Sequence, residues 1–145
     1  MNIEKQFFTG LNNDLRSIRE IVFVEEQGFT DEFDDVDIDN ISFHLLLYIE
    51  GKPVATGRLY QKNPFDSIYI IGRLAVLSDY RRLNLGSIVL NSLEEKAREC
   101  GASSIELSAQ CRVQGFYEKH GYRAIGSIYL DGDCPHILMI KDLYI

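Results

Sequence analysis

Apolar residues recur at helical spacing near the start of the chain. They fall on one face of a helix and are Leu11, Leu15, Ile18 and Val22. Asn12 or Asn13 can cap the beginning of such a helix, and Gly28 can end it. The pattern therefore predicts an amphipathic helix from about residue 12 to residue 28, followed by an acidic, aperiodic loop over residues 29–41.

The remaining apolar segments predict strands and two further helices. Residues 42–50 and 53–60 flank Gly51-Lys52 and predict a hairpin, and residues 68–76 predict a third strand. The later elements are expected to be helices over 85–99 and 113–120, and strands over 105–109, 122–130 and 137–143. Hairpins before a strand–helix–strand–helix–strand unit indicate an α/β protein (α+β mixed sheet), with a central twisted sheet flanked by helices.

Length and composition are typical of one globular domain. The 145 residues are 46% hydrophobic and carry a formal net charge of −7, which disfavours nonspecific nucleic-acid binding. The start of the sequence lacks a basic region followed by an apolar stretch, and no apolar run approaches the roughly 18 residues of a membrane span. We therefore expect a cytoplasmic protein with neither a nucleic-acid nor a membrane partner.

Acidic residues gather in one part of the chain. Ten lie between Arg19 and Lys52, an interval without lysine or arginine. Such a segment would favour a cationic ligand if it bordered a binding site; the alternative is a solvated loop that keeps the protein soluble. Within it, Asp35-x-Asp37-x-Asp39 begins like a calcium loop, but Asn40 replaces the required glycine and Leu46 the required glutamate. We expect no metal site.

The stretch over residues 71–90 predicts an anion site. An apolar strand runs into a turn that holds Arg81, Arg82 and Asn84, and a helix begins near Gly86. Free amide groups at a helix N-terminus, its dipole and two arginines together favour a phosphorylated ligand. The spacing fits neither the P-loop nor the dinucleotide fingerprint. The alternative is that Gly86 only allows close helix packing and that the arginines are solvated.

The segment Arg81-Arg82-Leu83-Asn84-Leu85-Gly86 resembles the Arg/Gln-x-x-Gly-x-Gly/Ala pyrophosphate loop of the GNAT superfamily of acyl-CoA-dependent N-acyltransferases. It departs at Asn84, where the first glycine usually stands, but asparagine tolerates a left-handed backbone. A second segment agrees, with the matching residues Gln110, Phe116, Tyr117, Gly121 and Tyr122 in order. The resemblance covers about residues 42–142 and is nearest to the ElaA-like subgroup, because the sequences around residues 22–27, His44 and residues 131–136 also match.

The resemblance implies a single N-acetyltransferase (GNAT) domain over residues 1–145, with acetyl-CoA as cosubstrate and an amine acceptor. It also implies that the strand over 71–76 diverges from the strand over 105–109 and leaves a wedge for the pantetheine arm. The implied cofactor-binding residues are Leu74, Ala75, Val76, Arg81, Arg82, Leu83, Asn84, Leu85, Gly86, Ser87, Gln110 and Phe116. The acceptor and a homodimer stay open.

Tyr117 is the expected general acid for the departing thiolate, because a phenol both orients the sulfur and donates a proton. The alternative is a core aromatic residue. Candidate general bases, by resemblance to the subgroup, are Glu26, Glu25 and His44, each with a structural alternative. His136 fits either the acceptor mouth or a strand edge, and His120 a helix terminus.

Two functions from different classes agree with these residues. The first is acetyl transfer from acetyl-CoA to an amine of a small molecule, peptide or protein. The second is an acyl-CoA-binding sensor or interaction module with little turnover. The three cysteines are odd in number and widely spaced, which disfavours a disulfide framework; a nucleophilic Cys111 is a minor alternative.

Overall fold

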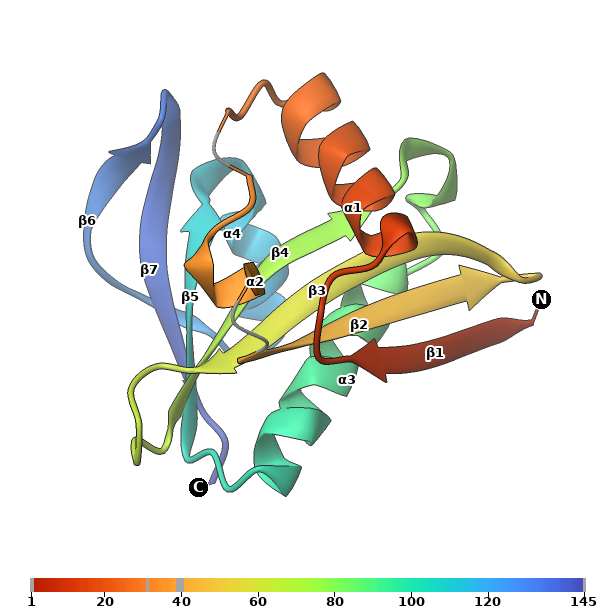
Figure 1. Cartoon of the computed structure of the whole chain (residues 1–145). Helices are drawn as coiled ribbons and strands as arrows, with labels where there is room; N and C mark the ends of the chain where they lie inside the picture. The colour runs from red at the N-terminus through yellow and green to blue at the C-terminus, as the bar shows by residue number, and fades with distance from the viewer. Residues whose placement is uncertain (1, 31, 39–40, 145) are drawn as a thin grey trace.

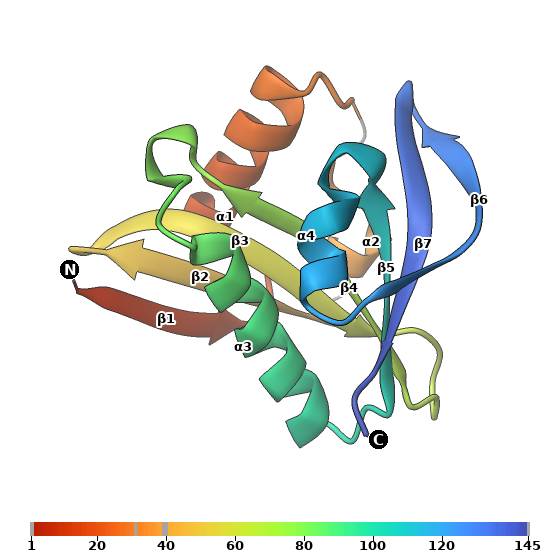
Figure 2. The same ribbon diagram turned by 180° about the vertical axis from the view of Figure 1, so that it is seen from behind.

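The computed structural model describes residues 2–30, 32–38 and 41–144, which form one twisted seven-stranded sheet with helices on both faces (Figures 1 and 2). The strand order is β1-β2-β3-β4-β5-β7-β6. The strands are β1 (Ile3–Phe8), β2 (Ser42–Ile49), β3 (Lys52–Gln61), β4 (Ile68–Val76), β5 (Ser104–Gln110), β6 (Arg123–Asp131) and β7 (Cys134–Asp142). Only β4 and β5 pair in parallel; the other described neighbours pair antiparallel.

The helices divide between the two faces. Helix α1 (Asn13–Arg19), its continuation η1 (Glu20–Glu26) and the short α2 (Asp35–Ile38) lie on the face seen in Figure 1. The long α3 (Leu85–Glu99) and α4 (Gln114–Lys119) lie on the other face (Figure 2). Two short 3₁₀ turns, η2 (Ser78–Tyr80) and η3 (Cys111–Val113), precede α3 and α4. No helix in the described ranges is long and apolar enough to cross a membrane.

The sequence pattern predicted most of these elements. The strand over 68–76 and the helix over 85–99 are confirmed at their bounds, and Asn12 caps α1 by accepting from the Leu15 amide at 2.8 Å. Three features were not predicted. The edge strand β1 lacks a clear alternation of polar and apolar residues, η1 has π-helical hydrogen bonding, and α2 lies inside the segment expected to be an irregular loop.

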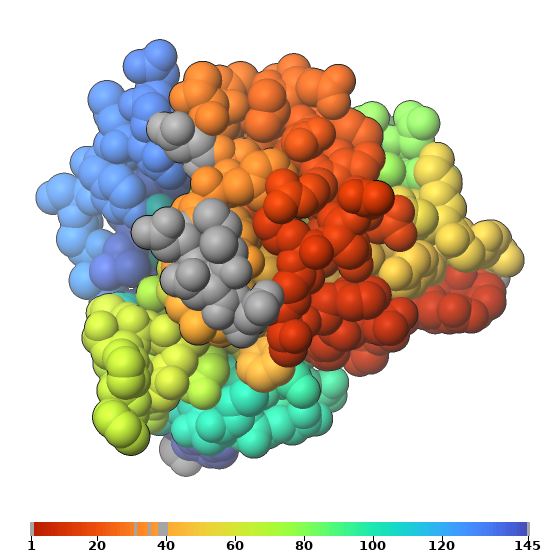
Figure 3. All heavy atoms as spheres, in the orientation of Figure 1, coloured from red at the N-terminus to blue at the C-terminus, as the bar shows by residue number. Residues whose placement is uncertain are grey.

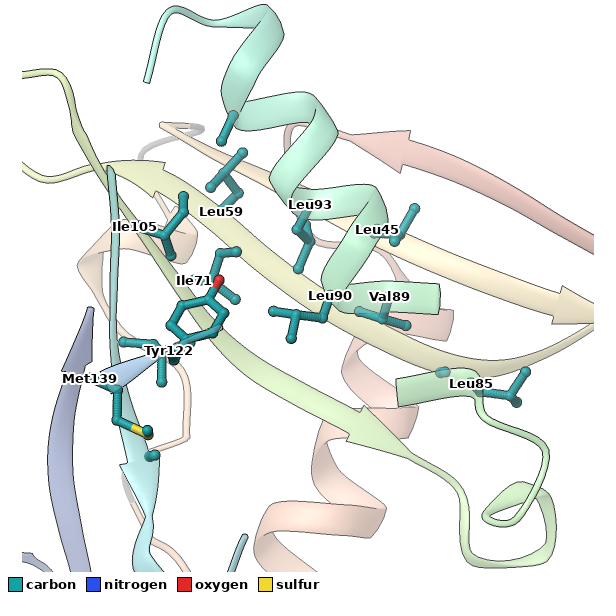
Figure 4. Packing of buried hydrophobic residues seen from close by; sticks show 14 of the residues in the cluster. Leu45, Leu59, Ile71, Leu85, Val89, Leu90, Leu93, Ile105, Tyr122 and Met139 are labelled. Atoms are coloured by element: carbon teal, nitrogen blue, oxygen red, sulfur yellow. The ribbon is translucent and has the colours of Figure 1, made fainter. Parts of the chain in front are cut away.

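The larger hydrophobic core lies between α3 and the sheet (Figure 4). Leu85, Val89, Leu90 and Leu93 of α3 are fully or almost fully buried there. Gly57 of β3 makes this close approach feasible, because a Cβ atom at this position would lie 2.7 Å from side-chain atoms of Leu93 and Val89. A smaller cluster under α1 includes Leu15, Ile18 and Ala75, so β4 is covered on both sides where the candidate site begins.

Candidate active site

The central feature of the site is a split between β4 and β5. The strands pair only through Ile68–Ser104, Tyr69–Ile105 and Ile70–Glu106 and then separate, as the resemblance implied. On its other side β4 continues to pair with β3 as far as Val76. The split opens into a cleft of about 1230 Å³. Beyond Ile70, β4 therefore presents the cleft with a backbone edge that has no described strand partner.

The expected cofactor-binding residues are largely brought together along this cleft. Among its lining residues are Leu74, Ala75, Val76, Arg81, Arg82, Asn84, Leu85, Gly86, Ser87, Gln110 and Phe116. Leu83 is the exception, since it is 40% exposed and absent from the lining. The backbone edge of β4 and the N-terminus of α3 consequently face one continuous space, large enough for an extended ligand.

The turn before α3 adopts the backbone expected from the resemblance. Asn84 has φ 62° and ψ 24°, in the left-handed region, so it takes the conformation for which glycine is usually used. Gly86 faces the Phe116 ring, and a Cβ atom there would lie 3.4 Å from it. The first turn of α3 thus points unpaired amide groups and the positive end of the helix dipole toward the cleft.

Arg81 connects this turn with the helix on the opposite side of the cleft. Its Nε donates to the Val76 carbonyl at 2.9 Å, and its Nη2 donates to Glu26 Oε1 at 3.0 Å. Glu26 is a candidate base from the sequence, but its carboxylate lies beside Arg81, at the turn expected to bind the cofactor. The geometry therefore favours a role in holding Arg81 over a role in deprotonating the acceptor. Glu25 is not among the residues that line the cleft.

Tyr117 lies on α4 and reaches the cleft from the α3 face of the sheet. Its ring packs edge-on against Phe116 and Tyr122, with centroids 5.1 Å and 5.9 Å away. Burial raises the pKa of Tyr117 to about 12. The phenol therefore stays protonated at neutral pH and is suited to donate a hydrogen bond to an atom in the cleft.

His44 does not reach the cleft. It lies on β2 between Phe8 and Arg58 of the neighbouring strands, is 1% exposed, and is not among the lining residues. Burial lowers its pKa to about 4, and its Nε2 is 3.8 Å from Asp37 Oδ1. The candidate base expected from the sequence is therefore a neutral core histidine here, and its placement argues against contact with an acceptor.

Part of the acidic segment is buried rather than solvated. Glu32 and Asp37 are 5% and 2% exposed, and Arg19 donates to both, at 2.6 Å to Glu32 and 2.8 Å to Asp37. Burial raises the pKa of Asp37, but hydrogen bonds from Arg19 and from the Asp34 amide hold that pKa below its ordinary value. Burial raises the pKa of Glu32 above its ordinary value.

Two arginines from the sheet complete this arrangement. Arg58 of β3 donates to Asp34 at 2.8 Å and to Asp37 at 3.2 Å, and Arg73 of β4 donates to the Glu32 carbonyl at 3.1 Å. Arg58 and Arg73 also line the cleft. Three acids of the segment, Glu32, Asp34 and Asp37, are thus paired with arginines from distant segments. In the sequence, the position of Arg58 and Arg73 inside predicted strands was the available sign that these arginines pair with buried acids.

Aromatic and polar side chains line the cleft between the end of η1 and β7. Phe29 follows η1, and its ring lies edge-on to His136 of β7 with centroids 6.5 Å apart. Figure 3 shows the corresponding orange and blue segments side by side on the surface. Gln110 is bonded by its Nε2 to Gln27 at 2.8 Å, so the two walls also meet at the end of β5. Asp131 and Asp133 lie on the rim.

Comparison with known proteins agrees with this geometry. The model of the acetyltransferase (GNAT) family matches residues 8–122. The chain is 37% identical over 126 residues to the uncharacterized N-acetyltransferase YjcF of Bacillus subtilis (strain 168), covering 86% of this chain and 88% of YjcF. This chain belongs to the GNAT acetyltransferase family.

Two solved structures extend the comparison. The crystal structure of Escherichia coli ElaA has a TM-score of 0.86 and 26% identity, covering 97% of this chain and 100% of that one. An aminoglycoside 6'-N-acetyltransferase complexed with coenzyme A has a TM-score of 0.76 over 100% of this chain and 98% of that one. At 18% identity the latter shows a shared fold. The relation to ElaA and the GNAT fold, both expected from the sequence, are confirmed.

Proposed function

We propose that this protein transfers the acetyl group of acetyl-CoA directly to a primary amine and functions as a single domain over residues 1–145. The observation that carries the proposal is the split between β4 and β5, with an unpaired strand edge and a helix N-terminus along one cleft. The strand edge of Leu74–Val76 supplies backbone groups for the amides of the pantetheine arm. The amides of Arg82–Ser87 and the charge of Arg82 supply an anion site for the pyrophosphate.

The transfer depends mainly on holding the amine beside the thioester carbonyl. The amine must lose a proton, attack the thioester carbonyl, and expel coenzyme A as a thiolate, which takes up a proton. Tyr117 is the proposed donor at the sulfur, since its side chain lines the cleft and its phenol keeps its proton. We do not assign the base to His44 or Glu26, because one is buried outside the cleft and the other is bound to Arg81.

The second candidate is an acyl-CoA-binding sensor with little turnover. The same strand edge and helix terminus favour it, because both concern binding rather than chemistry. Titration calorimetry with acetyl-CoA tests the feature that the candidates share. Incubation with acetyl-CoA and a panel of primary amines, followed by release of free thiol, separates them.

The outcomes are distinct. Binding with amine-dependent thiol release supports the transferase, and binding without it across aliphatic, aromatic, polyamine and peptide amines supports the sensor. Absence of acetyl-CoA binding by a folded protein contradicts both. The acceptor, a cytoplasmic location and a homodimer stay as predictions from the sequence.

A further inference from the structure

His136 occupies a position in the cleft that the proposed function leaves unused. It lies on β7, is 5% exposed, and lines the cleft. Its Nδ1 is 2.9 Å from the Cys134 carbonyl oxygen. A carbonyl oxygen can only accept a hydrogen bond, so Nδ1 carries the proton of the neutral ring. The other nitrogen, Nε2, is then the basic one.

The ring is held on both sides. Tyr129 of β6 stacks on it, with centroids 6.1 Å apart and planes inclined by 25°, and Phe29 meets it edge-on. Tyr129 is itself bonded through its hydroxyl to Ser108 of β5. Contacts from three different segments therefore fix the orientation of the imidazole, as a base near a reacting atom requires.

His136 and Tyr117 belong to opposite faces of the sheet. Side chains alternate along a strand, and Ile137 and Met139 of β7 belong to the core on the α3 face, against which Tyr117 also packs. His136 directly precedes Ile137, so its side chain points to the opposite face of the sheet. There it contacts Phe29, which packs in the cluster under α1. The split between β4 and β5 thus has a phenol on one side and an imidazole on the other.

We infer that His136 is the general base that accepts the proton of the acceptor amine. This assignment rests on the proposed acetyl transfer. The ammonium proton moves to Nε2 of His136, and the freed lone pair attacks the thioester carbonyl. The C–N bond forms and the C–S bond breaks. Coenzyme A leaves as a thiolate that takes the proton of Tyr117. The second proton of the attacking nitrogen passes through water to the Tyr117 phenolate and restores it, and His136 then releases its proton to water.

Polar and charged side chains surround His136. Gln110 faces it across the ladder from β5, and Tyr129 faces it from β6. The remaining titratable or charged side chains that share the cleft are Glu32, Arg58, Tyr60, Arg73, Arg81, Arg82, Arg112, Tyr117, Asp131, Asp133 and Cys134. Because these side chains carry both positive and negative charges, they can also change the rate with pH. The test therefore compares each His136 variant with the wild type at every pH.

The first test measures the tautomer. Nitrogen-15 NMR of the folded protein, with the His136 signals assigned by their loss in His136→Gln, is expected to show a protonated Nδ1 and a bare Nε2 in the neutral ring. A proton on Nε2 overturns the assignment, because the nitrogen that does not face Cys134 would then have no lone pair to offer. This measurement needs no acceptor, so it tests the required tautomer of His136 even if no amine in the panel reacts.

The second test is kinetic. With any amine that the wild type acetylates, His136→Ala and His136→Gln should lower kcat/KM by roughly 10²-fold and remove the acidic limb of the pH profile. Added imidazole should restore part of the activity of His136→Ala, which a purely structural role would not allow. The control, His120→Gln, removes the histidine bonded to Ser87 and should keep the acidic limb.

The two proposals fail separately. Retention of the acidic limb and of the rate in folded His136 variants that bind acetyl-CoA overturns the base assignment and leaves acetyl transfer intact. Absence of acetyl-CoA binding by the wild type contradicts the proposed function, and the base assignment that rests on it falls with it.

Discussion

Arg19 binds Asp37 through two parallel hydrogen bonds, Nη1 to Oδ1 at 2.8 Å and Nη2 to Oδ2 at 2.9 Å, and both side chains are buried. Asp37 also accepts from Arg58 of β3. The pair therefore joins the end of α1 to α2 and to the sheet. It fixes the wall that carries Glu32 into the cleft, because Arg19 binds Glu32 as well.

Asp37→Asn is expected to destabilise the fold strongly. The substitution leaves Arg19 and Arg58 buried with less opposing charge, and loss of one partner of a buried ion pair costs roughly 3–5 kcal/mol. Urea unfolding measures the change. The matched control is Asp142→Asn, which breaks an exposed pair with Arg123 and should cost less than about 1 kcal/mol. Equal losses in the two variants would contradict the structural role of Asp37.

The buried His44 is expected to contribute to the loss of folding stability at acid pH. Its pKa in the folded protein is lowered from 6.5 to about 4 by burial, so the unfolded chain takes up the proton first as the pH falls. The corresponding stability is present above pH 6.5 and is lost as the pH falls to about 4, by at most ~3 kcal/mol. Urea unfolding of wild type and His44→Leu at pH 7 and pH 4.5 should show a smaller loss in the variant. An equal loss would show that other groups account for it.

Gly57→Ala should destabilise the protein through overpacking. The new methyl group would lie 2.7 Å from side-chain atoms of both Leu93 and Val89, so α3 would have to shift. The expected cost is about 1–3 kcal/mol in urea unfolding. Gly115→Ala is the control, since nothing lies within 4 Å of its Cβ position in α4. That change should be neutral or slightly stabilising, because alanine has the higher helix propensity.

Local patterns predicted the elements of the site better than its side-chain contacts. The mostly apolar run over residues 68–76, Asn84 before the helix and the apolar spacing within residues 85–99 predicted β4, its turn and α3. The ion pairs of Arg19, Arg58 and Arg73 could not be predicted, because they join segments 13 to 41 positions apart. His44 and His136 were similarly ambiguous, since an imidazole within an apolar strand is compatible with either face of a sheet.

Arg81→Glu should weaken acetyl-CoA binding by more than tenfold in titration calorimetry. It places a negative charge at the turn proposed to hold the pyrophosphate and removes the bond to Glu26. Arg123→Glu makes the same charge change on β6, outside the lining of the cleft, and should leave the affinity nearly unchanged. Unchanged affinity in a folded Arg81→Glu protein would contradict the proposal that this turn holds the pyrophosphate.

Glu26→Gln distinguishes the two roles considered for that carboxylate. If Glu26 only holds Arg81, the variant should bind acetyl-CoA with an affinity within a few-fold of the wild type, since an exposed pair contributes less than about 1 kcal/mol. The acid limb of the pH–rate profile should remain. Loss of that limb with unchanged acetyl-CoA affinity would instead support Glu26 as the general base.

Tyr117→Phe should separate binding from chemistry. The ring keeps its packing against Phe116 and Tyr122, so acetyl-CoA affinity should hold, whereas turnover should fall by roughly 10²-fold if donation to the thiolate limits the rate. Because burial raises the pKa of Tyr117 to about 12, the wild-type rate should show no loss from phenol ionisation at neutral or mildly alkaline pH. Single-turnover measurements of thiol release across pH test both statements. An unchanged rate, with thiol release shown to be limiting, would exclude Tyr117 as the principal donor and leave water in that role.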